Sequence, residues 1–192
     1  MTNKRNDNIN LLEEIFIKGQ VYKNILSKKE VWKNIAEILN GKFTIKQTIS
    51  RDITSFTLEI PYENKIIILT ETDVKPLKSQ IILELNNKFE LNISKEDSIE
   101  KFMIFLGKQD IKIGFPEFDK KYLIQSNDSI KAINILTNLK ELILNLNIYS
   151  ISIQNTKEQY HKINITKDRN TNKTSEIIDF IKLNFKLIDS II

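Results

Sequence analysis

The chain has 192 residues, of which 41% are hydrophobic and 28% charged, a balance typical of a globular protein with a substantial buried core. It contains no cysteine and a single histidine, which excludes disulfides, thiolate catalysis, cysteine metal sites and multi-histidine clusters within one chain. The net charge of +4 comes from lysines scattered among acids, and the only arginines are Arg5, Arg51 and Arg169. This pattern indicates a solvated surface rather than a dedicated phosphate-binding patch.

No apolar run approaches the roughly 18 residues that a membrane-spanning helix needs. The first residues, MTNKRNDNIN, are polar and lack the apolar core of a secretory signal. We therefore expect a cytoplasmic location. The length fits a single domain over residues 1–192, with an alternative internal boundary near 75–79 or near 107.

The first part of the chain is expected to form two helices. One runs from Asp7 to Ile17 and is ended by Gly19. The other follows Ser27-Lys-Lys-Glu30, whose spacing matches a capping box with the serine as N-cap. This second helix carries Trp32 on an apolar stripe of helical spacing, so we expect the indole to anchor the core.

From Phe43 to Ile93 the hydrophobic period changes to two, which predicts a run of strands. The apolar segments are 43–49, 56–60, 66–69, 81–85 and 89–93. Residues Ile66–Leu69 are apolar at every position, which is typical of a strand covered on both faces. A hairpin joining the last two segments through the three-residue loop Asn86-Asn87-Lys88 would place Leu83 opposite Leu91 on one face.

The second half of the chain mixes helices and strands. Ser94 is expected to cap a helix over 99–106, and Asn127 or Asp128 to cap helical segments over 130–136 and 139–146. Strands are expected over 148–153 and 160–165, and a last helix from Ser175 to Asp189. Because the strands are largely consecutive, we predict an α+β fold with a mainly antiparallel sheet of about seven to nine strands and about four to six helices.

The stretch from Gly107 to Ser129 holds the densest combination of glycine, proline, aromatic residues and acids. Two short apolar runs, Ile111–Ile113 and Tyr122–Ile124, flank Gly114-Phe-Pro-Glu117, where glycine permits a positive φ and proline fixes φ. The pattern predicts a helix–strand–turn–strand–helix junction, with its aromatic rings in the core and its acids at the rim.

The same stretch resembles a pattern in uncharacterised bacterial proteins. In them a G-x-x-x-F-D-x-x-(F/Y) segment joins a sheet to the following helix, and here it is matched by Gly114-Phe-Pro-Glu-Phe-Asp-Lys-Lys-Tyr122. Trp32-x-x-Ile35-Ala36 precedes it as in that group. The resemblance implies a bacterial, intracellular, globular protein and carries no activity with it.

An enzymatic hypothesis for this stretch is a metal-dependent nuclease. Such sites use one acid, and a second acid two residues before a lysine, to hold Mg²⁺ and activate water. Asp110 and Asp119-Lys120-Lys121 have this order, and Glu117 is placed to assist. Asp110, Asp119 and Lys121 are therefore the candidate catalytic residues, and the alternative is that the acids lie on a surface turn.

Other catalytic signatures are missing from the sequence. His161 has no serine or acid arranged around it as in a triad, so we expect it to be structural and partly exposed at a strand start. The four glycines are too far apart for a G-x-x-x-x-G-K or G-x-G-x-x-G phosphate loop. We therefore expect no cofactor.

A nucleic-acid surface is another hypothesis, since such surfaces interleave aromatic rings with lysines. Phe43, Lys46, Phe56 and Lys65 could be combined into one, although the same phenylalanines fit the inner face of a sheet.

The function that we favour is a non-catalytic module that binds a protein partner, as accessory, adaptor and immunity-type proteins do. The last helix has an apolar stripe that could lie in a partner's groove, so the terminal helices are one expected contact surface. The other is the turn, with Phe115, Glu117, Phe118 and Asp119.

Overall fold

The computed structural model describes residues 10–13, 21–22, 24–48, 53–85, 88–96, 110–157 and 160–192. Its helices are α2 (Ile25–Ile38), α4 (Pro116–Lys121), α5 (Ser129–Asn145) and α6 (Thr174–Ile191), and residues 10–13 are also helical. Its strands are β1 (Lys42–Thr48), β2 (Ile53–Tyr62), β3 (Lys65–Thr72), β4 (Lys78–Glu84), β5 (Leu91–Lys95), β6 (Tyr122–Ser126), β7 (Ile148–Lys157) and β8 (Tyr160–Lys167).

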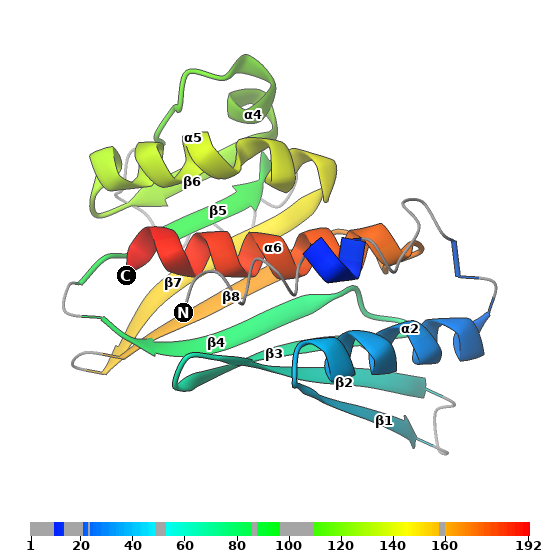
Figure 1. The fold of residues 1–192 in the computed structure, drawn as a ribbon. Coiled ribbons are helices and arrows are strands. Elements are labelled where there is room, and N and C mark those ends of the chain that lie inside the picture. The colour runs from blue at the N-terminus through cyan, green and yellow to red at the C-terminus, as the bar shows by residue number, and fades with distance from the viewer. Residues whose placement is uncertain are drawn as a thin grey trace.

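All eight of these strands form one sheet in the order β1-β2-β3-β4-β8-β7-β5-β6, and every neighbouring pair is antiparallel. The first four strands follow one another across the sheet. The chain then crosses to the far edge, builds β5 and β6, and returns with β7 and β8 to fill the centre (Figure 1). The predicted α+β class with a mainly antiparallel sheet is confirmed.

Helices α2, α5 and α6 lie on the same face of the sheet, which we call the inner face (Figure 1). Alternate strand residues point into this layer, as the period of two requires: Phe56, Leu58 and Ile60 of β2 are all buried. Trp32 is fully buried on α2, with its ring 5.6 Å from that of Phe56, so the predicted core anchor is confirmed.

The last helix is part of this core. Ile178, Ile181, Phe185 and Ile188 of α6 are all buried, and the expectation that this stripe binds a partner is therefore wrong. The stripe is already used, because α6 supplies the apolar surface that the centre of the sheet needs.

Two of the predicted helix starts need correction. The helix with Trp32 begins at Ile25, and Asn24 rather than Ser27 is its N-cap: Asn24 Oδ1 accepts from Ser27 N at 2.9 Å, and Ser27 is the third residue of the capping box. Ser94 lies within β5 and pairs with Leu123, so it is not an N-cap. The helix predicted over 99–106 lies outside the described residues. The choice of Asp128 to cap α5 is confirmed, since its carboxylate accepts from Lys131 N at 3.0 Å.

The predicted hairpin between β4 and β5 is wrong. These strands lie in different parts of the sheet, with β8 and β7 between them. Leu83 stands opposite His161, and Leu91 opposite Ile153. Both strands do turn their apolar residues to the inner face, so the alternation indicated the face correctly but could not identify the neighbour.

The stretch around Gly114 also differs from its prediction. No strand is formed over 111–113, and Pro116 begins helix α4 at its first position, where a missing N–H costs nothing. The positive φ at Gly114 is present, at 79°. The helix leads directly into β6 and then α5, so a helix stands where the turn was expected.

Candidate functional site

Asp119, the central residue of the nuclease hypothesis, bonds to the backbone of its own loop. One carboxylate oxygen accepts from Ile113 N and the other from Gly114 N, each at 2.9 Å. The two amides precede α4 and have no helical acceptor, so the carboxylate holds the loop in the left-handed bend at Gly114. Both oxygens are therefore engaged in shaping the chain.

Asp110 closes the edge of the sheet. Its Oδ1 accepts from Ile124 N at 3.0 Å, and Ile111 N donates to Ile124 O at 2.9 Å, so this segment satisfies both outward backbone groups of Ile124, the central residue of β6. Its other oxygen lies 2.6 Å from Lys112 Nζ. A sheet edge that is covered in this way is protected from pairing with another chain.

Lys121 lies in a different electrostatic environment from the two acids. Burial, with the neighbouring Lys95 ammonium as the next cause, lowers the pKa of Lys121. Lys95 itself donates to Asp168 at 2.9 Å. Across the residues that the structure describes, no three His, Cys, Asp or Glu side chains gather as metal ligands would. The geometry gives Asp110 and Asp119 structural roles and offers the nuclease hypothesis no support.

The other residues expected to bind a partner at this turn are unequally accessible. Phe118 is fully buried, with its ring 4.7 Å from that of Tyr122. Phe115 is half-buried beneath Lys140, whose Nζ lies 5.4 Å from the ring centre, and Glu117 is exposed. Of these side chains, the turn exposes only part of the Phe115 ring and the Glu117 carboxylate, which is a small surface for binding a partner.

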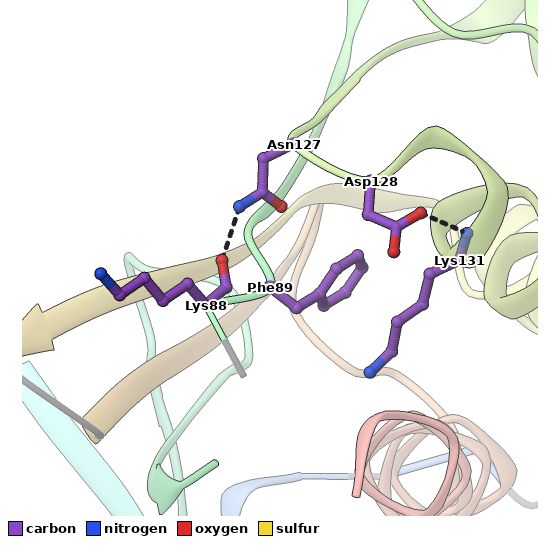
Figure 2. A pocket seen from close by; sticks show the side chains of 5 residues that line it. All are labelled: Lys88, Phe89, Asn127, Asp128 and Lys131. Carbon is purple, nitrogen blue, oxygen red and sulfur yellow. Dashed lines mark hydrogen bonds between the residues drawn. The ribbon is translucent and has the colours of Figure 1, made fainter. Parts of the chain in front are cut away.

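A pocket of about 280 Å³ opens where the chain enters β5 and α5 (Figure 2). It is lined by Lys88, Phe89, Asn127, Asp128 and Lys131. Asn127 Nδ2 donates to Lys88 O, and Asp128 caps α5. Lys131 Nζ donates to Ile191 O at 3.2 Å and lies 4.9 Å from the centre of the Phe89 ring. Figure 2 shows the bonds from Asn127 to Lys88 and from Lys131 to Asp128, and the bond from Lys131 to Ile191 adds the end of α6, so these side chains have structural roles.

The face of the sheet opposite the helices, which we call the outer face, is polar for most of its width. Strand register places Ile68, Gln80, Asn164, Ser152 and Asn92 in one row across five strands. A parallel row contains Thr70, Lys78, Thr166, Ser150 and Ser94. Such a composition is typical of a sheet face that meets solvent or another molecule.

Between β3, β4 and β8 the outer face is hollowed by about 340 Å³. The side chains around the hollow are those of Ile68, Thr70, Lys78, Gln80, Asn164 and Thr166, and the backbone of Ser79 adds to its wall. We call this the β4 hollow. Its volume lies within the range of small-ligand and side-chain pockets.

The outer face also carries three exposed isoleucines, which we call the isoleucine patch. One of them, Ile68, lines the β4 hollow, and Ile66 lines a smaller pocket with Glu59 and Pro61. Ile66 and Ile68 of β3 are 52% and 37% exposed, and Ile82 of β4 is 53% exposed. The prediction that Ile66–Leu69 is covered on both faces is therefore wrong for the described part of the chain: Ile67 and Leu69 are buried, but Ile66 and Ile68 are not. The apolar run marked this strand, but the sequence did not indicate what would cover its second face.

Two further predictions concern the inner face. His161 is fully buried opposite Leu83, not partly exposed, because its position in β8 alternates inward. Phe56 is buried, and the centre of the Phe43 ring lies 6.2 Å from that of Trp32, while Lys46, opposite Ser55, belongs to the outer face. The phenylalanines therefore belong to the inner core, as the alternative to a nucleic-acid surface supposed.

No helix among the described residues is long and apolar enough to cross a membrane. No family model matches the chain, and no curated protein matches it. Among solved structures, the crystal structure of the mycobacterial trehalose monomycolate transport factor A has a similar fold, with a TM-score of 0.52 and 8% sequence identity. The match covers 84% of this chain and 93% of that chain. At this identity the likeness shows the fold alone.

Proposed function

We propose that this chain is a non-catalytic accessory protein that binds a protein partner through the isoleucine patch and the β4 hollow. One observation carries the proposal. Strand β3 has the continuous apolar sequence of a strand buried on both faces, yet the described helices cover only its inner face. A partner that lies on the outer face would supply the missing cover.

The energetics favour such a contact. Completing the burial of each half-exposed isoleucine contributes on the order of 1 kcal/mol, since full burial of such a side chain is worth roughly 1.5–3 kcal/mol. Contiguous exposed apolar side chains rimmed by polar ones mark interaction sites. The β3–β4 ladder ends at Ile68 opposite Gln80, and Ile82 lies two residues further along β4 on the same face as Gln80.

The comparison of folds supports an accessory role. A chain of similar fold is a transport factor by name, so this architecture is compatible with work alongside other proteins. The bacterial origin and the cytoplasmic location expected from the sequence belong to the same proposal.

The proposal is tested by affinity purification of the tagged protein from its own cells. Ile82→Asp places a charge in the patch, and the matched control is Ile130→Asp, because Ile130 is a 73% exposed isoleucine on α5. We expect proteins that co-purify with the wild type to be lost with Ile82→Asp and kept with Ile130→Asp. The same set of co-purifying proteins with the wild type and with both variants would contradict the proposal.

A further inference from the structure

The β4 hollow has a chemistry of its own beside the apolar patch. Thr70 and Lys78 lie opposite each other, and so do Lys78 and Thr166. The row next to them sets Ile68 opposite Gln80, and Gln80 opposite Asn164. One ammonium group therefore stands among hydroxyl and amide groups, and Ile68 adds an apolar side chain to the lining of the hollow.

These polar groups are not used by the protein's own hydrogen bonds. In the part of the chain that the structure describes, the side chains of Thr70, Lys78, Gln80 and Thr166 form no hydrogen bond or ion pair, and Asn164 makes one long bond of 3.4 Å to Ser152. The contrast with the pocket of Figure 2 is clear, since there Asn127, Asp128 and Lys131 are all engaged.

Among the described residues, the charge of Lys78 has no counterion on its own face of the sheet. The outer-face acids of the described strands are Glu59 and Glu84. Glu59 stands opposite Lys42 on β1, and Glu84 lies at the far end of β4. A carboxylate brought by another molecule would therefore meet an unneutralised ammonium flanked by hydroxyl and amide donors, a complementary arrangement for an anionic side chain.

The distance along β4 from Lys78 to Ile82 sets the spacing between the two groups that a partner would present. Lys78, Gln80 and Ile82 point to the same face of β4, and four residues of strand span about 13 Å. We infer that the outer face binds a partner segment that places an aspartate or glutamate in the β4 hollow at Lys78 and an apolar side chain about 13 Å away at Ile82. This inference rests on the proposed function and specifies the chemistry of the partner.

Selection of random twelve-residue peptides displayed on phage against the purified full chain tests the inference. The wild type is expected to enrich peptides that combine an acid with an aliphatic or aromatic residue. Lys78→Glu should weaken these peptides at least about tenfold, and peptides whose acid is changed to lysine should regain affinity for that variant. The matched control is Lys186→Glu, on the exposed side of α6, which should leave binding unchanged.

Other outcomes separate this inference from the proposed function. Peptides that lose binding with Ile82→Asp but not with Lys78→Glu would overturn the acid contact and leave the partner-binding face intact. Peptides indifferent to both substitutions, or no enrichment over empty phage, would overturn the inference. Glutarate is the small-molecule probe: if it displaces the peptides at micromolar concentration, the hollow is a site for a small carboxylate and the peptide inference fails.

Discussion

Replacing Asp119 by alanine separates the structural role of this carboxylate from a metal-binding one. The substitution removes the acceptor of two charge-assisted hydrogen bonds, from Ile113 N and Gly114 N. A hydrogen bond to a charged group contributes roughly 1.5–3 kcal/mol. The Gly114 amide lies in an exposed setting and regains water, so we expect the free energy of unfolding to fall by about 2–3 kcal/mol in total. Asp119→Asn keeps one good acceptor and should lose about half as much.

Urea unfolding followed by circular dichroism measures the effect, with the denaturant slope expected to stay constant. Glu117→Ala is the matched control, because Glu117 is an exposed acid of the same helix, and its change should stay within about 0.5 kcal/mol. If Asp119→Ala is as stable as the wild type, or more stable, the structural role is refuted. Stabilisation of the wild type by Mg²⁺ that vanishes in Asp119→Ala would instead restore the metal hypothesis.

Three further predictions follow from the same region and its neighbours. Phe118→Ala leaves a cavity beside Tyr122 and should lower the free energy of unfolding in urea by about 3–5 kcal/mol. Phe115 is only half-buried, so Phe115→Ala should lower it by about 1 kcal/mol. Equal losses for the two variants would contradict this packing. The hydrogen bond from Lys95 holds the pKa of Asp168 below its ordinary value of 3.8, so this carboxylate stabilises the fold above about pH 4 and the contribution fades as the pH falls. The free energy of unfolding of Asp168→Asn should therefore be lower than that of the wild type at pH 6, and the gap should narrow as the pH falls below 4. A constant gap would argue against the ion pair. Burial raises the pKa of Tyr122 above its ordinary 10.0, so ionisation of this phenol favours unfolding. The free energy of unfolding should therefore drop more steeply above pH 10 in the wild type than in Tyr122→Phe. Parallel curves of the two proteins at alkaline pH would be inconsistent with this burial.

The sequence predicted which face of the sheet a residue lies on better than it predicted which strands pair with each other. Alternation in β2 correctly placed Phe56 and Leu58 on the inner face, because a period of two leaves only two choices for each residue. It paired β4 with β5 incorrectly, because strands with the same alternation can pair in many orders and the return of β7 and β8 is a long-range event. The register of Leu83 opposite His161 has no local signal.

The candidate site was harder to predict for a physical reason. An acid that binds a metal and an acid that binds backbone amides have the same residue letter, so Asp119 fitted both hypotheses until its contacts were known. The run Ile66–Leu69 did contain information, since it indicated a strand with two apolar faces. The sequence did not single out Lys78, because a lysine on the polar face of a strand is common. Its polar surroundings become visible only when the residues opposite it on β3 and β8 are known.

Photo-cross-linking on the outer face tests the central claim most directly. Benzoylphenylalanine replaces Ile68 in one variant and Ile130 in the control, and both are expressed in the protein's own cells and irradiated. Our account predicts a discrete cross-linked protein for position 68, lost when Ile82→Asp is added, and none for position 130. Adducts at both positions alike, or none at position 68, would contradict the claim that this face of the sheet is where a partner binds.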